Sequence, residues 1–261
     1  MIATRPVAPA LDAEVAAVAQ VTPNVRRITL RGLDEMAVRG ADQWFRLFLP
    51  RHRGQPLRLP RSTTGWWPET LAMPETERPL VRNYTVRAAR PHRAEIDVDF
   101  VLHGDEGAAS AWAASAEPGD RVGVLDQGVM FAPPPRTRWQ LLVGDETALP
   151  AIAGVLRTLP AGVPTRVYVE LPSPRDAQPL RISRDVHVTW LPRPAGAMPG
   201  SLATEAVSTA TLPDADAAYA WLAGESSMVR MLRRHLVNTR GVAKSAITFT
   251  GYWRHGVSYS I

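Results

Sequence analysis

The chain has 261 residues, enough for two domains of ordinary size, and its 45% hydrophobic and 21% charged residues are typical of a globular protein. It contains no cysteine, which excludes disulfides, thiolate-bound zinc, iron–sulfur clusters and a cysteine nucleophile. The net charge of +5 is spread without a polybasic block, which gives little support to a nucleic-acid tail and fits a cleft for an anionic small molecule.

The first half of the chain predicts short β-strands separated by glycine and proline. Strands at this spacing, without intervening helices, favour an antiparallel barrel. Residues 51–79, rich in arginine, proline and tryptophan, read as a long connection of the kind that is often functional. The predicted strands cover residues 13–21, 26–32, 44–50, 81–87 and 94–104.

One of these strands, RNYTVR, places a ring, a hydroxyl and two guanidinium groups close together at Arg82, Tyr84, Thr85 and Arg87. A tyrosine ring can stack on a flat heterocycle, and arginine can bind a phosphate through two hydrogen bonds. The threonine hydroxyl can donate to or accept from a ring nitrogen. The segment therefore indicates a site for something flat and anionic, with a solvated edge strand as the alternative.

The next segment, VLHGDEGAASAWA, ends a strand and begins a short helix predicted over residues 108–114. The N-terminus of this helix can present free N–H groups to a phosphate, with Ser110 as the hydroxyl in that turn. His103 ends the strand, where a single histidine is more often structural than catalytic.

After the proline-rich joint FAPPPRTR (131–138), predicted strands alternate with helices, which favours a parallel sheet with helices on both faces. We therefore expect an antiparallel β-barrel domain over residues 1–134 and a parallel α/β domain over residues 135–261. The predicted strands cover residues 139–145, 166–171, 186–192, 218–224 and 245–253, and the predicted helices cover residues 147–159 and 226–238.

Two strand-to-helix turns of the α/β domain are candidate ligand sites, because open α/β sheets bind ligands at the carboxyl ends of their strands. The first, in GDETALPAI, has one glycine rather than G-x-G-x-x-G, so the usual dinucleotide motif is absent. The second contains Gly224 and Glu225. Ordinary capped crossover helices are the alternative at both turns. Trp253, in the C-terminal GYWRHG, either fills a domain interface or covers a cofactor.

Taken in order, these segments resemble the siderophore-interacting proteins, a branch of the ferredoxin–NADP reductase superfamily. RNYTVR is similar to the family's R-x-Y-[ST] flavin motif, and VLHGDEGAASAWA to its second flavin segment. GDETALPAI is similar to the entry of the nucleotide domain, and AGESSMVRMLRRHL with GYWRHG to the C-terminal part. The resemblance extends over nearly the whole chain.

The resemblance implies FAD in the first domain and NADPH or NADH in the second. Tyr84 and Thr85 would be catalytic, with the ring stacked on the isoalloxazine and the hydroxyl near flavin N5, and Arg82 and Arg87 would hold the phosphates. The rest of the flavin pocket would be lined by His103, Ala109, Ser110 and Trp112. The nicotinamide nucleotide would be bordered by Asp145, Glu146, Thr147, Ala148, Gly224, Glu225 and Trp253.

The activity implied is hydride transfer from the nicotinamide to the flavin, followed by delivery of single electrons to the Fe(III) of a ferric siderophore, which releases Fe(II). Reduction weakens the grip of hard oxygen ligands on iron. Anionic chelates would be drawn to basic residues, with Arg46, Arg240, Lys244 and Arg254 as the candidates and a solvated barrel strand as the alternative for Arg46. No resident metal site is expected.

The nucleotide preference is read from the end of the second α/β strand. Ser173 and Arg175 follow it and suit a 2′-phosphate, so NADPH is favoured, while Glu170 keeps NADH open.

Two other functions are considered: a reductase of the same superfamily that acts on a ferredoxin-like partner or free flavin, and a basic nucleic-acid-binding module. The second lacks a polybasic segment or a base-reading motif. The N-terminus lacks the pattern of a secretory signal, and no apolar stretch is long enough to span a membrane. We expect a cytoplasmic monomer without membrane insertion, with a ferredoxin as an additional candidate for the electron donor.

Overall fold

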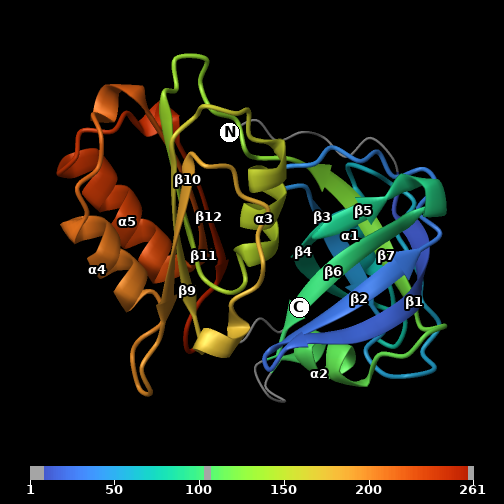
Figure 1. The fold of residues 1–261 in the computed structure, drawn as a ribbon. Coiled ribbons are helices and arrows are strands. Elements are labelled where there is room, and N and C mark those ends of the chain that lie inside the picture. Colours follow the sequence, from blue (N-terminus) through green and yellow to red (C-terminus); the bar gives the residue numbers. More distant parts are fainter. Residues whose placement is uncertain (1–8, 103–106, 258–261) are drawn as a thin grey trace. The chain divides into compact units, whose positions relative to one another are not determined.

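The structure is a computed structural model that describes residues 9–102 and 107–257 (Figure 1). The chain divides into two compact units, the first reaching Met130 and the second beginning at Phe131. Within the described ranges, none of the helices combines the length and apolar character needed to cross a membrane.

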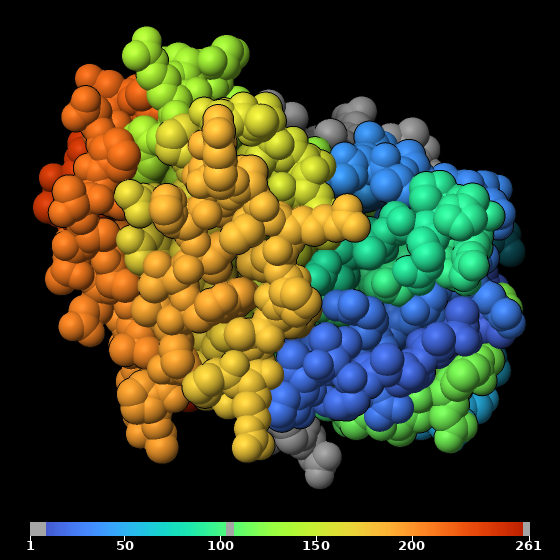
Figure 2. Space-filling model, viewed as in Figure 1, coloured from blue at the N-terminus to red at the C-terminus, as the bar shows by residue number. Residues whose placement is uncertain are grey.

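The first unit is built on a seven-stranded antiparallel sheet in the order β4-β3-β7-β1-β2-β6-β5. Alternate residues of the strands point inward, and Ile28, Phe45 and Val98 are among the side chains that fill a dry core. In the space-filling view, β1 and β2 lie side by side in blue on the surface of this unit (Figure 2). The elements are β1 Leu11–Thr22, β2 Val25–Arg31, β3 Trp44–Leu49, α1 Trp66–Ala72, β4 Leu80–Thr85, β5 Ala88–Arg90, η1 Pro91–Arg93, β6 Glu95–Val101, α2 Ala108–Ser115 and β7 Arg121–Gly128.

The chain passes from one edge of this sheet to the other directly after Thr85. The backbone N–H of Val86 donates to Gln43, just before β3, whereas the N–H of Arg87 donates to Asp97 of β6. The stretch 81–87 is therefore not one strand as predicted, because its two ends pair with opposite edges of the sheet. This crossing curls the sheet into a barrel and places the RNYTVR segment at its corner.

The second unit is a five-stranded parallel sheet in the order β10-β9-β8-β11-β12. Helix α3 covers one face, and α4 and α5 cover the other (Figure 1). From β8 the chain moves outward to β9 and β10 and then returns to β11, so the topological switch point lies between β8 and β11. The elements are β8 Trp139–Gly144, α3 Leu149–Thr158, β9 Thr165–Leu171, η2 Pro174–Asp176, β10 Val186–Pro192, α4 Ser201–Thr209, η3 Ala215–Ala217, β11 Ala218–Glu225, α5 Ser226–Asn238, η4 Lys244–Ala246 and β12 Ile247–Trp253.

The predicted fold class, an antiparallel β-barrel followed by a parallel α/β domain, is confirmed. Among the described strands and α-helices, four were not predicted, namely β5, β7, α1 and α4. Strand β7 has two glycines and few β-branched residues, yet it lies between β1 and β3, where burial outweighs intrinsic propensity. Helix α1 interrupts the predicted connection over residues 51–79, and α4 is a short helix that packs on α5.

Candidate functional site

An aromatic cluster lies at the barrel corner, assembled from β4, β6 and α2. The ring centroid of Tyr84 is 4.2 Å from that of Phe100, at an interplanar angle of 38°. The centroids of Phe100 and Trp112 are 5.5 Å apart. Burial raises the pKa of the Tyr84 phenol, which therefore stays protonated and uncharged. The structure thus brings together two predicted flavin residues, Tyr84 and Trp112, through a third ring that the sequence did not single out.

The polar residues of the RNYTVR segment have different surroundings. Thr85 is only 6% exposed. Arg82 is half-buried, burial lowers the pKa of its guanidinium, and its Nη1 donates to the carbonyl of Val81. Arg87 Nε lies 3.5 Å from Asp99 Oδ2, and the same carboxylate also accepts from Arg27. Arg87 therefore already has a carboxylate neighbour, which takes up part of its charge.

Helix α2 begins at Ala108, and its N-cap Gly107 provides no side-chain hydrogen bond to the first turn. Ala109 and Ser110 are buried there, and N–H groups at a helix start favour an anion. His103 lies outside the described residues. These residues fit a flavin with a pyrophosphate. The ring can stack on the flavin and the buried hydroxyl can hydrogen-bond it, while the half-buried arginine and the N–H groups at the start of α2 suit the phosphates.

In the second unit, the centre of the carboxyl edge is Asp145, which is 0% exposed and directly follows β8. Its Oδ2 accepts hydrogen bonds from the backbone N–H of Glu225 at 2.7 Å and from Trp253 Nε1 at 2.8 Å. Its Oδ1 accepts from the backbone N–H of Thr147 at 2.9 Å. Burial, followed by repulsion from Glu146, raises the pKa of Asp145 to about 6, against the effect of these donors.

Gly224 is required for this arrangement. Its φ is +127°, a region that side chains rarely adopt, and a Cβ at this position would lie 2.5 Å from Asp145 Oδ2. Glu225 follows and accepts from the backbone N–H groups of Ser227 and Met228 at the start of α5. Asp145, Thr147, Glu225 and Trp253 thus form one hydrogen-bonded group, and Gly224 leaves the space that Asp145 occupies. Ala148 is buried directly beside them.

Sequence reasoning missed Arg193, which follows β10 at the same edge of the sheet. Its guanidinium lies between two buried carboxylates, with Nη2 at 2.7 Å from Glu146 Oε1 and Nη1 at 3.2 Å from Glu170 Oε1. Glu170 also accepts from the backbone N–H groups of Gly200 and Ala203, where α4 begins. The rule that ligands gather at the carboxyl ends of strands, applied to the third strand as well, would have indicated Arg193.

The two residues predicted to bind a 2′-phosphate lie in and just before η2. The Ser173 hydroxyl oxygen accepts from the Arg175 N–H at 3.2 Å, and the Arg175 side chain is exposed. Within residues 9–102 and 107–257, no carboxylate forms an ion pair with Arg175. Its charge is therefore available to a ligand, unlike that of Arg193.

The four basic residues predicted to bind the chelate are not all at a candidate site. Arg240 follows α5 at the amino edge of the sheet, and its Nη2 donates to the carbonyls of Ser208 and Ala210 at the end of α4. Lys244 begins the turn before β12, at the same amino edge. The structure does not bring these two residues to Asp145, because α5 runs the length of the sheet between the two edges.

Arg254, by contrast, directly follows β12 at the carboxyl edge and is exposed. Arg46 lies on β3 of the first unit, where its guanidinium carbon is 4.4 Å from the ring centroid of Trp66.

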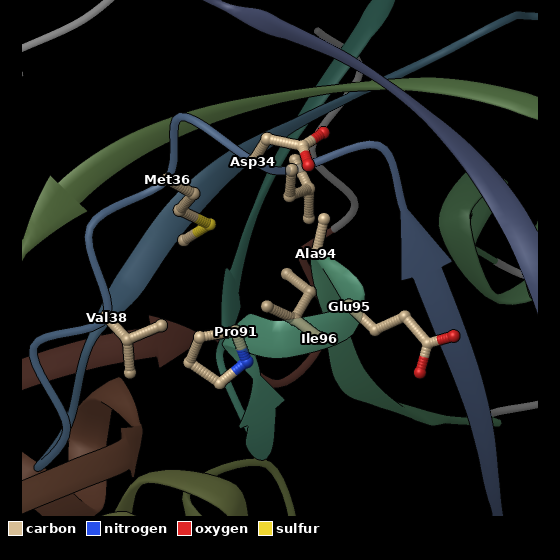
Figure 3. A pocket seen from close by; sticks show the side chains of 8 residues that line it. Asp34, Met36, Val38, Pro91, Ala94, Glu95 and Ile96 are labelled. Carbon is tan, nitrogen blue, oxygen red and sulfur yellow. The ribbon is translucent and has the colours of Figure 1, made fainter.

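Two small cavities among the described residues lie apart from the predicted flavin and nucleotide residues, and Arg240 lines the second of them. The first, of about 40 Å³, is closed by Met36, Val38, Pro91 and Ile96, whose side chains face one another (Figure 3). The second, of about 190 Å³, lies beside Trp139 and Leu236 near the amino edge of the parallel sheet. No predicted flavin or nucleotide residue lines either cavity.

Two family models match the chain. The model described as siderophore-interacting FAD-binding domain matches residues 14–130, and the model described as siderophore-interacting protein matches residues 137–256. An uncharacterized protein of Mycobacterium tuberculosis is 35% identical, over 93% of this chain and 89% of its own length. Ferric vibriobactin reductase ViuB of Vibrio cholerae is 30% identical, over 90% of this chain and 86% of its own.

Solved structures agree. The siderophore-interacting protein SipS from Aeromonas hydrophila has a TM-score of 0.78 and 30% identity, covering 97% of this chain and 94% of its own. A ferredoxin NADP⁺ reductase from Neisseria gonorrhoeae, with bound FAD and NADP, shares the fold at 14% identity, with a TM-score of 0.63 over 94% of this chain and 100% of its own.

Proposed function

The chain belongs to the siderophore-interacting protein family, and on this basis we propose that it is a flavin-dependent ferric-siderophore reductase. It takes electrons from a reduced nicotinamide nucleotide, passes them through FAD and delivers them to chelated Fe(III), so that iron leaves as Fe(II). The relative named ferric vibriobactin reductase supports this assignment. The observation that carries it is the aromatic cluster at the barrel corner, where Phe100 joins Tyr84 of β4 to Trp112 of α2.

In this proposal the first domain, residues 1–134, holds FAD, which supplies the conversion of a hydride into single electrons. Tyr84 would stack on the flavin ring, and the buried hydroxyl of Thr85 would serve a nitrogen of that ring as a hydrogen-bond partner. Arg82 and the N–H groups at the start of α2 hold the pyrophosphate. Arg87 acts with Arg82 but is weaker for an anion, because Asp99 already neutralises part of its charge. His103, Ala109, Ser110 and Trp112 complete the pocket.

The second domain, residues 135–261, binds the nicotinamide nucleotide at the carboxyl edge of its sheet. Asp145, Gly224, Glu225 and Trp253 form the floor, together with Glu146, Thr147 and Ala148. Ser173 and the unpaired charge of Arg175 suit a 2′-phosphate, so NADPH is the preferred donor. Glu170, the residue that kept NADH open, is buried and already paired with Arg193 and with the start of α4.

The ferric siderophore is the substrate, and Arg46 and Arg254 are the basic residues that we assign to it. Arg240 and Lys244 are not assigned to it, because the amino edge of the sheet is remote from the proposed nucleotide floor. We propose that the working form is a monomer in the cytoplasm, where reduced nicotinamide nucleotides are available.

A ferredoxin is the second candidate for the electron donor, and one observation favours it. The N–H groups at the starts of α4 and α5, where a dinucleotide phosphate commonly binds, are taken by the chain's own Glu170 and Glu225. Anaerobic reduction by NADPH, by NADH and by a reduced ferredoxin, compared on one preparation, distinguishes these donors.

The visible absorption spectrum of the purified protein tests the function. We expect an oxidised-flavin spectrum after FAD is supplied, bleaching on anaerobic addition of NADPH, and recovery on addition of a ferric siderophore. Bleaching without recovery would support a flavin reductase but contradict the ferric siderophore as its electron acceptor. If no flavin binds, the assignment of the barrel corner is wrong.

A further inference from the structure

The outer face of β3 carries an arginine between two tryptophans. The guanidinium carbon of Arg46 lies 4.4 Å from the ring centroid of Trp66 and 5.5 Å from that of Trp44. Trp66, at the start of α1, is held in place by an edge-to-face contact with the buried Phe48, whose centroid is 6.0 Å away. Both tryptophans are only half-buried, so part of each ring is accessible. We call Trp44, Arg46 and Trp66 the indole–arginine plate.

Among the residues that the structure describes, Arg46 has no carboxylate partner. Its Nη1 donates to Asn83 Oδ1 at 3.0 Å, and its Nε is buried without a hydrogen-bond partner in the described part of the chain. Burial lowers the pKa of its guanidinium. On the same sheet, Arg27 and Arg90 each lie against aspartate carboxylates. A half-buried guanidinium without a carboxylate favours the arrival of an external anion.

The plate has the chemistry to recognise an anion that is also aromatic. A guanidinium gives directional hydrogen bonds to paired oxygens, and indole rings offer faces on which a flat ring can stack. An iron-bound catecholate combines both features, since its two charged oxygens lie in the plane of a benzene ring. Hydroxamate arms have no such ring and form uncharged ferric complexes, and citrate is anionic without a ring.

We propose that the indole–arginine plate binds one catecholate arm of the ferric chelate and makes the protein selective for catecholate siderophores. This inference rests on the proposed function, in which Arg46 contacts the chelate, and adds Trp44 and Trp66 as residues that determine specificity. The plate is also suitably placed along the chain. Asn83, which is paired in register with Arg46, directly precedes Tyr84, the proposed flavin-stacking residue.

Binding of three chelates to the FAD-loaded protein tests the inference. Equilibrium dialysis, followed by the visible absorption of the chelate, gives Kd for ferric enterobactin (a tris-catecholate), ferrichrome (an uncharged trihydroxamate) and ferric citrate. We expect Trp66→Leu to raise the Kd for ferric enterobactin about tenfold and to change the Kd for ferric citrate by no more than about twofold. Arg46→Gln should weaken the binding of both anionic chelates, ferric enterobactin and ferric citrate. Neither variant should change ferrichrome binding.

Trp67→Leu is the matched control, because the Trp67 ring lies beside Trp66, with centroids 5.3 Å apart, but is not part of the plate. It should leave all three Kd values unchanged, and equal flavin content should show that every variant is folded. The inference is overturned if Trp66→Leu loses the same affinity for all three chelates, or loses none for ferric enterobactin. The proposed function would survive that result as long as the wild type still passes electrons to ferric chelates. If the wild type binds no ferric chelate, the proposed function fails as well.

Discussion

At the scale of single residues, the pKa of Asp145 is set by opposing effects of burial and hydrogen bonding. Complete burial disfavours its charged form, whereas backbone N–H groups, the Thr147 hydroxyl and the Trp253 indole all favour that form. The result is a carboxyl with a pKa of about 6, well above its reference value of 3.8. Perturbed carboxyl groups of this kind gather at functional sites, which agrees with the proposed nucleotide floor.

This shift makes the stability of the protein depend on pH. Because the folded-state pKa of Asp145 is raised, its stabilising contribution is complete below about pH 4 and is lost as the pH rises through about 6. The loss amounts to about 3 kcal/mol. Urea unfolding of the wild type and of Asp145→Asn, measured between pH 4 and 7, should give a difference in unfolding free energy that changes across this window. A constant difference would contradict the raised pKa.

Tyr84 carries the prediction for the flavin. Tyr84→Ala removes the stacking surface and should weaken FAD binding about tenfold or more, because stacking of a ring on a base is worth about 1–3 kcal/mol. Tyr84→Phe keeps the ring and should retain FAD. The flavin-to-protein absorbance ratio after gel filtration measures both variants, and an unchanged ratio in Tyr84→Ala would show that the ring does not stack on the flavin.

At the scale of elements, the chain uses its own charged side chains to hold helix ends. Glu170 accepts hydrogen bonds at the start of α4, Glu225 does so at the start of α5, and Arg240 donates to carbonyls at the end of α4. Carboxylates at N-termini and a guanidinium at a C-terminus also complement the helix dipole. These contacts fix the helices that cover one face of the parallel sheet.

A substitution of Arg240 tests whether this residue has a structural role or a substrate-binding role. Arg240→Met keeps the aliphatic stem but removes the hydrogen bonds to Ser208 and Ala210, and should lower the free energy of unfolding by about 1–3 kcal/mol. The rate of ferric-chelate reduction should be unchanged. Lys244→Met, at an exposed position of the same edge, is the control and should alter neither quantity. A reduced affinity for the chelate in Arg240→Met would return Arg240 to the substrate site.

At the scale of the whole molecule, the net charge of +5 and the exposed arginines attract anionic chelates over a distance set by salt. The screening length is about 10 Å at 0.1 M ionic strength, so the attraction is strongest in dilute buffer. The same charge gives no reason to expect specific nucleic-acid binding, since the basic residues are not gathered into one segment.

Arg254 should account for part of this attraction. Arg254→Ala should weaken binding of an anionic ferric chelate several-fold at about 20 mM ionic strength and much less at about 300 mM. Arg184→Ala, which removes an equal charge before β10 at the amino edge, is the matched control and should have little effect at either salt concentration. Equal losses at both salt concentrations in Arg254→Ala would assign Arg254 a structural role.

The sequence by itself determined the order and type of most elements, because apolar periodicity and turn residues act over a few neighbouring positions. Helix α5 was predicted with the bounds that the structure has, and the barrel, the parallel sheet and the turns at Asp145 and Gly224 were all indicated. The RNYTVR segment was recognised for the same reason, since its ring, hydroxyl and guanidinium groups are close together in the chain.

Only the tertiary structure decided which charged groups meet. Arg193 is paired with Glu146, 47 positions away along the chain, and Arg46 lies against Trp66 from a different element. Arg240 was assigned to the substrate from its charge alone, but the fold directs it to the end of α4. Local sequence patterns do not indicate such partners, because burial and ion pairing depend on which distant segments the packed core brings into contact.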